Sequence, residues 1–192
     1  MLKTELFNGE IQMKKLAALT GVMLMAAAEA MAQDKAAKPA RRLVVSLPDR
    51  KLAVLEAGRV LKIFPTAVGA SKSPSPAGSY TIVLRLTNPT WYGKGKVVPP
   101  GKGCPIGSRW LGLNVKGYGI HGTNNPASIG HDASHGCIRL RNRDIEELFD
   151  MVSIGDAVEL VGERTAETME VFGPDPAVQT TIATAAATGG VQ

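Results

Sequence analysis

The sequence is poor in aromatic residues, in cysteine and in histidine. Only 5% of its 192 residues are Phe, Trp or Tyr, so a hydrophobic core must rest on Val, Leu and Ile. Two cysteines allow at most one disulfide bond. No internal repeat is present, and the length suits one domain with its own core. Frequent glycine (21) and proline (12) favour short strands and turns over long helices.

Long hydrophobic runs are also missing, and the longest one has a specific interpretation. It covers residues 16–28, follows the basic Met13-Lys14-Lys15, and precedes the small-residue sequence Ala30-Met31-Ala32. A membrane-spanning helix needs about 20 apolar residues, so this run is too short to be an anchor. The pattern instead predicts a signal peptide over 1–32, cleaved near Ala32, and export to the periplasm. Residues 1–12 lie upstream of a typical signal and suggest a misplaced start.

The charge distribution is uneven. The formal net charge is +5, and residues 34–162 contain 18 basic against 10 acidic residues. A basic exported domain suits a polyanionic partner such as a cell-wall polymer, although the same charge could simply favour solubility. We expect no nucleic-acid partner, because the chain is predicted to be exported and has no nucleic-acid-binding motif. We also expect no stable membrane insertion, since no second apolar segment could span a bilayer.

The domain boundaries follow from composition. Residues 33–42 form a polar leader and residues 163–192 an Ala/Thr-rich tail, and both are predicted to be disordered. Between them, 43–162 reads as a single mostly-β domain. Its predicted strands are 43–47, 51–56, 60–69, 80–87, 110–115, 117–121 and 156–161. Residues 88–109 form a long loop rich in Gly, Pro and Lys, which we interpret as a lid or a linker.

One α-helix is predicted, at about residues 143–153. Asn142 could cap it, and Asp144 would favour its positive end. Ile145, Leu148, Phe149 and Val152 follow the spacing of one apolar helix face, and Gly155 ends the pattern.

The residues that could carry chemistry gather between 118 and 144. This stretch holds all three histidines, His121, His131 and His135, together with Cys137. A cysteine becomes a nucleophile when a base or a positive field favours its thiolate. His135 is two residues from Cys137, whereas His121 could approach it only across the fold. Gly136 could offer an N–H group to a developing oxyanion.

Several other interpretations remain open from the residues alone. Cys137 could be a buried structural thiol, or it could form a disulfide with Cys104. His121, His131, His135 and Cys137 could hold a metal ion, although their spacing matches no usual zinc pattern. His131, between Gly130 and Asp132, reads as a surface loop residue.

A resemblance favours one of these interpretations. The stretch 120–144 reads I-H-G-T-N-N-P-A-S-I-G-x-x-x-S-H-G-C-I-R-L-x-N-x-D. It closely resembles the signature of the L,D-transpeptidase catalytic domain, the YkuD family. The similarity continues in S-L-P-D-R-K-L-A-V (46–54), V-G (68–69), P-S-P-A-G-S-Y-T-I (74–82), N-P-T-W (88–91) and P-I-G-S-R-W-L-G-L (105–113). It covers about 43–162 and implies a β-sandwich-like catalytic domain with a cysteine nucleophile.

The resemblance also implies roles for particular positions. Cys137 corresponds to the nucleophile and His121 to its base, with the carbonyl of Gly122 orienting the imidazole. His135 and Gly136 would shape the site and the oxyanion hole.

Four further positions are implied to bind substrate: Ser134, Arg139, Asn142 and Tyr118. Arg139 and Arg141 alternate with apolar residues, so both would face one side of a strand, which could bind a carboxylate. One departure concerns Cys104, which stands where many relatives have Asn before a P-L-G element. A disulfide between Cys104 and Cys137 would silence the site.

The implied reaction is two-step acyl transfer on peptidoglycan. Cys137 would attack the donor stem peptide before its terminal D-Ala, and an acceptor stem would resolve the thioester as a 3–3 cross-link. Attachment of a protein to the wall is a variant of the same transfer. Alternatives are an L,D-carboxypeptidase or amide hydrolase using the same site, and a non-catalytic wall-binding domain. The resemblance implies that the protein needs neither a metal nor an organic cofactor. It also implies that carbapenems acylate Cys137. We expect a monomer.

Overall fold

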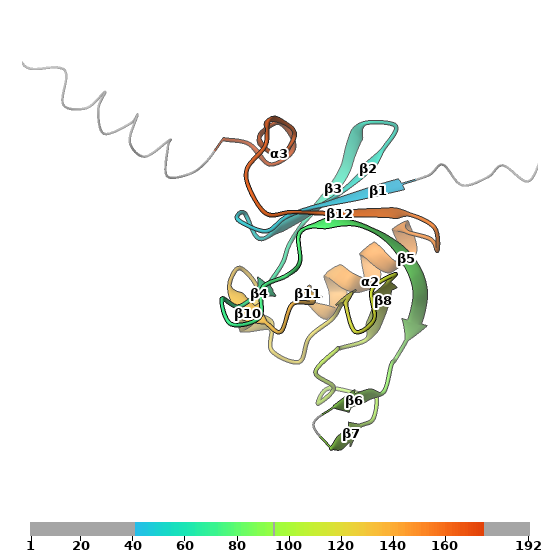
Figure 1. Ribbon diagram of the computed structural model, residues 1–192. Helices are drawn as coiled ribbons and strands as arrows, with labels where there is room; N and C mark the ends of the chain where they lie inside the picture. Colours follow the sequence, from blue (N-terminus) through green and yellow to red (C-terminus); the bar gives the residue numbers. More distant parts are fainter. Residues whose placement is uncertain (1–40, 94, 175–192) are drawn as a thin grey trace, which may run out of the picture. The chain divides into compact units, whose positions relative to one another are not determined.

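The computed structural model of the protein describes residues 41–93 and 95–174 (Figure 1). The predicted signal peptide, most of the predicted leader and residues 175–192 lie outside these ranges. The described chain is mostly β, as predicted. Its main sheet has eight strands in the order β11-β9-β8-β5-β12-β1-β2-β3. The bounds are β1 Arg41–Ser46, β2 Lys51–Glu56, β3 Arg59–Pro65, β5 Gly78–Thr87, β8 Arg109–Leu113, β9 Gly119–His121, β11 Ile138–Arg139 and β12 Ala157–Val161.

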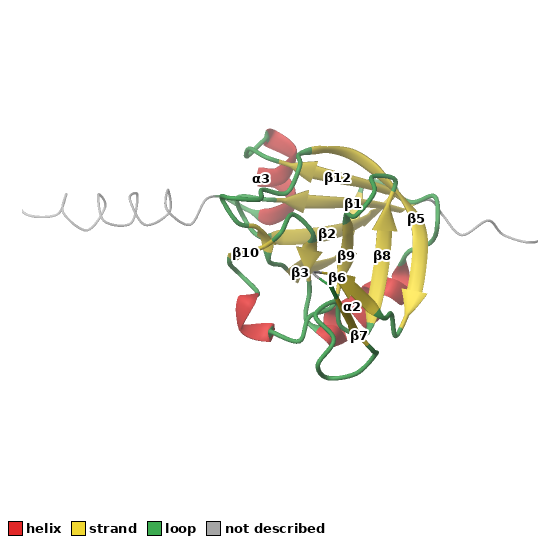
Figure 2. Ribbon diagram, turned by 60° about the horizontal axis from the view of Figure 1, so that its bottom comes forward, coloured by secondary structure: helices red, strands yellow, loops and turns green. Residues whose placement is uncertain are grey.

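Strand β5 explains why this sheet is sandwich-like. Its first residues pair with β12, from Gly78 to Thr81, and its later residues pair with β8, from Ile82 to Thr87. The register shifts between Ile82 and Leu84, and such a bulge increases strand bending. The long strand therefore curls, and its two halves belong to two parts of the sheet whose strands run in different directions (Figures 1 and 2).

The space inside the curl is filled by aliphatic side chains and one helix. Helix α2, Asn142–Met151, contacts β8 and β9 and buries Ile145 and Leu148. Phe64 is the one aromatic among the largest fully buried side chains, which are otherwise Leu, Ile and Val. Scarce aromatics and an aliphatic core thus agree with the prediction from composition.

The helix start differs from the prediction. The N-cap of α2 is Arg141, no side chain caps the helix, and Asn142 is its first residue. Asn142 does not cap because its side-chain oxygen is used by two loops, as described below. The helix ends at Met151, and Val152 provides the C-cap.

The predicted disorder is wrong at both domain edges within the described residues. Arg41 and Arg42 belong to β1, where they pair with Glu56 and Leu55 of β2. Helix α3, Ala166–Phe172, lies in the segment assigned to the tail. It is ordered by a Thr165–Thr168 capping box, by an ion pair between Arg42 and Glu167, and by Phe172, which packs on Val44, Ala53 and Leu55. The Ala/Thr-rich composition of this segment gave no indication of the packing of Phe172.

The long loop 88–109 carries a small hairpin of β6, Trp91–Gly93, and β7, Lys96–Val98. Two short strands, β4 Val68–Gly69 and β10 Asp132–Ser134, pair elsewhere, and a 3₁₀ turn, η1, covers Pro126–Ser128. None of the helices within 41–93 and 95–174 is long and apolar enough to cross a bilayer.

Candidate active site

A cavity of about 640 Å³ lies where the strand β9, the loop before β11 and the 88–109 loop meet. It brings together five of the predicted site residues: His121, Ser134, His135, Cys137 and Arg139. The other lining residues are Leu86, Pro89, Thr90, Trp91, Tyr92, Pro105, Ile106, Trp110 and Gly117. The 88–109 loop is therefore a wall of the cavity and not a remote linker. Gly122, Gly136, Tyr118 and Asn142 do not line the cavity.

Cys137 is a half-buried free thiol at the end of the loop that precedes β11. Its Sγ–H donates to the carbonyl oxygen of Gly117 at 3.5 Å. Burial raises the pKa of the Cys137 thiol, while a backbone hydrogen bond from Gly119 and the charge of Arg139 lower it. Burial is the largest of these effects, so the resting group is the thiol.

His121 ends β9 and is 4% exposed. Its Nδ1 lies 2.5 Å from the carbonyl oxygen of Gly122, which agrees with the predicted orienting role of that carbonyl. Because a carbonyl only accepts, Nδ1 carries the proton and Nε2 keeps its lone pair. Burial lowers the pKa of His121 to about 4, with a smaller lowering by Arg139 and a raising effect of the Gly122 carbonyl. The imidazole is therefore neutral at pH 7 and able to accept a proton.

Trp110 is a site residue that the sequence reasoning did not single out. It is the cross-strand neighbour of His121 in the β8–β9 pairing, and the two rings stack with centroids 5.3 Å apart. A tryptophan opposite a histidine in an aromatic-poor chain was the available signal. Recognising this pair from the sequence would have required the register between the two strands on either side of the turn at 114–118.

The loop Ser134–Cys137 is held by one buried serine. Ser134 Oγ donates to the carbonyl oxygen of Cys137 at 2.5 Å and accepts from the N–H of Gly136 at 3.0 Å. The second bond corrects a prediction: the Gly136 N–H is already used and is not free for an oxyanion. Ser134 thus holds the loop that carries Cys137, and it also lines the cavity.

The backbone conformation and the surroundings of Gly136 require glycine at this position. Its φ of 106° is a conformation that favours glycine, and a Cβ there would lie 2.7 Å from the ring of Tyr118. Tyr118 therefore packs beneath the loop and supports it, and does not face the cavity predicted to hold substrate.

Asn142 is also a supporting residue, and the structure does not place it as a substrate ligand. Its Oδ1 accepts from the N–H groups of Ser108 and Thr123, each at 3.2 Å. The same oxygen sits against Gly107 and Gly122, where a methyl group on either glycine would collide with it. Asn142 thereby ties the 105–109 segment to the residues that follow His121.

The remaining histidines differ in position. His135 is exposed and lines the cavity, whereas His131 is exposed and lies outside it. Among the described residues no group of three or more His, Cys, Asp or Glu side chains could hold a metal ion. The three histidines and Cys137 therefore do not form the metal site that was considered as an alternative.

The disulfide alternative is contradicted. Cys104 and Cys137 are both free, and Cys104 is fully buried. Its Sγ–H donates to the carbonyl oxygen of Pro89 at 3.4 Å, inside the base of the 88–109 loop. Cys104 therefore behaves as a small core residue of the cavity wall.

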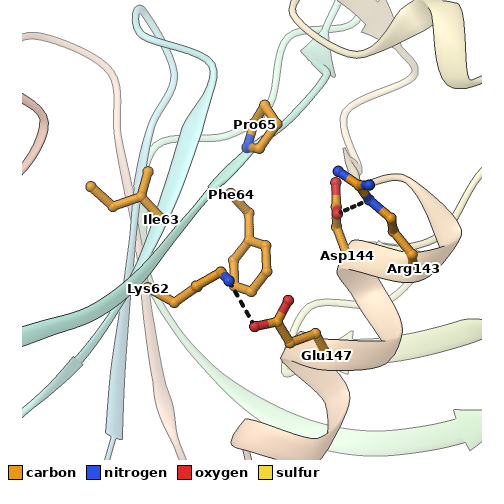
Figure 3. Close-up of a pocket in the computed structure, with 7 residues that line it drawn as sticks. All are labelled: Lys62, Ile63, Phe64, Pro65, Arg143, Asp144 and Glu147. Carbon is orange, nitrogen blue, oxygen red and sulfur yellow. Dashed lines mark hydrogen bonds and ion pairs between the residues drawn. The ribbon is translucent and has the colours of Figure 1, made fainter.

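A second cavity, of about 380 Å³, lies between β3 and α2 (Figure 3). Ion pairs Lys62–Glu147 and Arg143–Asp144 border it, and Phe64 and Pro65 contribute apolar surface. It contains neither cysteine nor histidine, so the cavity around Cys137 is the candidate active site.

A thiol and a neutral, oriented imidazole on one open cavity form the constellation of a cysteine acyl-transfer site. A family model described as the L,D-transpeptidase catalytic domain, YkuD, matches residues 40–160. The chain belongs to this family.

The relatives agree with that membership. A candidate L,D-transpeptidase YkuD from Bacillus licheniformis is 43% identical over 119 residues, which cover 62% of this chain and 64% of the relative. The chain therefore spans less than two thirds of that protein.

Solved structures share the fold. An L,D-transpeptidase from Mycobacterium tuberculosis aligns with a TM-score of 0.55 at 23% identity, covering 64% of this chain and 58% of that one. The LD transpeptidase LdtMt1 in complex with imipenem aligns with a TM-score of 0.54 at 25% identity, covering 64% and 59%.

Proposed function

We propose that the protein is an exported peptidoglycan L,D-transpeptidase that works through a cysteine thioester. The observation that carries this proposal is the pairing of a half-buried free Cys137 with a buried His121 of low pKa on one cavity. Family membership supports the reaction type, and a cavity of about 640 Å³ is of the size that binds small ligands.

The first half-reaction forms the acyl-enzyme. His121 Nε2 accepts the Cys137 proton as sulfur attacks the carbonyl between the third residue of the donor stem and its terminal D-Ala. The carbon–nitrogen bond breaks, D-Ala leaves, and its amine takes the proton from the imidazolium. The Gly122 carbonyl keeps the ring in the required tautomer throughout.

In the second half-reaction a side-chain amine of an acceptor stem attacks the thioester. Its proton passes to His121, the carbon–sulfur bond breaks, and the sulfur is reprotonated. The products are a 3–3 cross-link, D-Ala and the free enzyme. An amine on a protein would give wall attachment by the same steps, and water would give hydrolysis.

Location and partners follow from the same proposal. The signal-peptide pattern over 1–32 would deliver the chain to the periplasm, where peptidoglycan stem peptides serve as donor and acceptor. The protein would act as a monomer. It would need no cofactor, because acyl transfer by a thiol and an imidazole requires none.

The test uses the purified full-length chain with tetrapeptide muropeptides and mass spectrometry of the products. We expect cross-linked dimers and free D-Ala from the wild type and from Cys104→Ala, and neither product from Cys137→Ser. Tripeptide monomers without dimers would instead establish a carboxypeptidase. Absence of any product from the wild type would refute the enzymatic proposal.

A second measurement concerns imipenem, which is present in the structure of one neighbour. Intact mass spectrometry should show one covalent adduct on the wild type and none on Cys137→Ser. An adduct that persists in Cys137→Ser would place the reactive group elsewhere.

A further inference from the structure

Arg139 is fixed on the cavity wall by its backbone. Strand β11 places it opposite His121 of β9, and on its other side its N–H and carbonyl exchange two 2.9 Å hydrogen bonds with Ala67. Its side chain lines the same cavity as Cys137. Cys137 lies two residues before Arg139, and both side chains line this one cavity.

The Arg139 guanidinium has no acidic partner. Within 41–93 and 95–174 it forms no ion pair, and its Nε is buried without an acceptor. The cavity lining contains no Asp or Glu. Arg141, by contrast, lies near Asp144 at 3.7 Å. Arg85 also has a buried Nε without an acceptor, but its Nη2 donates to the carbonyl oxygen of Phe149 and its guanidinium lies over the Phe149 ring.

An unpaired, partly desolvated cation costs free energy, so its retention in a reactive cavity calls for a ligand. Burial lowers the pKa of Arg139 while the neighbouring Cys137 raises it, and an arginine remains charged at pH 7. The planar guanidinium matches a carboxylate, with which it forms paired, charge-assisted hydrogen bonds. The cavity therefore selects an anion close to the point of nucleophilic attack.

We propose that Arg139 binds an ionised carboxylate of the acyl donor, and that this contact makes the site selective for donors whose carboxylate is free and not amidated. The inference rests on the proposed function and names the donor class for it. Cα atoms two residues apart along a chain are at most about 7 Å apart, so a carboxylate within a few bonds of the scissile carbonyl is within reach of Arg139.

Two groups of a donor stem offer this chemistry. One is the terminal carboxylate of the D-Ala that leaves, and the other is the side-chain carboxylate of a diamino acid at the third position. Both are single negative charges near the scissile bond. Amidating one group at a time separates them without changing the size of the donor.

The experiment compares three synthetic tetrapeptide donors: both carboxylates free, terminal carboxamide, and side-chain carboxamide. The wild type should lose about tenfold or more in kcat/KM on amidation of one of them. Arg139→Gln should process free and amidated donors within about twofold of each other, and Arg139→Lys should keep part of the preference. Arg59→Gln removes a charge from the opposite edge of the sheet and should keep the full preference.

Binding supplies a readout that does not depend on turnover. Full-length Cys137→Ser should bind the free donor about tenfold or more tightly than the less favoured carboxamide, and the added Arg139→Gln should remove that difference. Alkylation by iodoacetamide, a neutral reagent, checks that Arg139→Gln still folds with an accessible Cys137. Equal binding of all three donors by Cys137→Ser, or a preference that survives in Arg139→Gln, would overturn the inference. Selective binding without any product would leave the Arg139 contact standing and refute the transpeptidase.

Discussion

Trp110 and His121 stack face to face across the β8–β9 ladder, with ring centroids 5.3 Å apart and an interplanar angle of 18°. The indole covers one face of the imidazole and keeps water from it. Burial is the largest cause of the low pKa of His121. The stacked indole contributes to this burial and so favours the neutral imidazole.

The first prediction concerns stability at acid pH. His121 has a folded pKa of about 4 against 6.5 when unfolded, so below pH 6.5 the unfolded chain binds more protons. Stability linked to this group is complete above pH 6.5 and is lost as pH falls to 4. The loss is about 3 kcal/mol. Urea unfolding at pH 7.5 and pH 4 should show that His121→Gln loses less stability than the wild type by this amount. Equal losses would contradict the burial of His121.

The second prediction concerns the pH dependence of activity. His121 must be neutral to accept the Cys137 proton, so kcat/KM should rise with an apparent pKa near 4 and stay level through pH 8. Burial raises the pKa of Cys137, so no further rise from ionisation of the thiol should appear in that range. Initial rates from pH 3.5 to 8.5 measure this profile. A rising limb centred near 6.5 would show a solvent-exposed histidine instead.

The sequence contained much of the fold, because its signals were local. Runs of β-branched and aliphatic residues between turn signals predicted β1, β2, β5 and β12, and the apolar spacing of Ile145 and Leu148 predicted α2. The tail helix α3 escaped prediction because distant contacts help to order it: the Arg42–Glu167 ion pair, and the packing of Phe172 on β1 and β2. The β5 bulge and the resulting curl likewise depend on pairing with two different strands.

The candidate site was likewise predicted in part. Resemblance identified Cys137, His121 and Gly122 by position, since a motif preserves residue types. It could not separate residues that face the cavity from those that support it. Ser134 and Asn142 are recurrent motif residues whose hydrogen bonds go to backbone groups, and that distinction appears only in three dimensions. Trp110 was missed because its partner lies across a ladder whose register the sequence does not state.

The third prediction concerns Ser134. Ser134→Ala removes both hydrogen bonds that hold the Cys137 loop, so kcat should fall about 10- to 100-fold with little change in KM. Ser128→Ala removes a comparable buried hydroxyl, bonded to Asn125 at 2.7 Å outside the cavity, and should leave kcat within about twofold. Steady-state kinetics on both variants decides. Equal effects would mean that Ser134 acts only through general stability.

The fourth prediction concerns the two thiols. Iodoacetamide should modify only Cys137 in the native protein, since Cys104 is fully buried, and both thiols in denaturant. Reductant should not change the rate of the reaction. Intact mass and activity with and without dithiothreitol are the measurements. Activation by reductant would restore the disulfide alternative.

The fifth prediction concerns Asn142, whose Oδ1 accepts from the backbone N–H groups of Ser108 and Thr123, the latter two residues after His121. Asn142→Ala leaves both donors without their acceptor and should cost about 1–3 kcal/mol of unfolding free energy, together with a lower kcat. Asn142→Asp keeps the acceptor oxygen and should recover most of the stability.

Asn114→Ala is the matched control, because it removes a similar 3.1 Å bond to the Thr81 N–H at an exposed position away from the cavity. It should cost less than about 0.5–1 kcal/mol and leave kcat unchanged. Urea unfolding and steady-state kinetics on the three variants separate the outcomes. If Asn142→Ala matched Asn114→Ala in both measurements, the side chain would not position His121, and a direct contact with substrate would become the better explanation of its place in the motif.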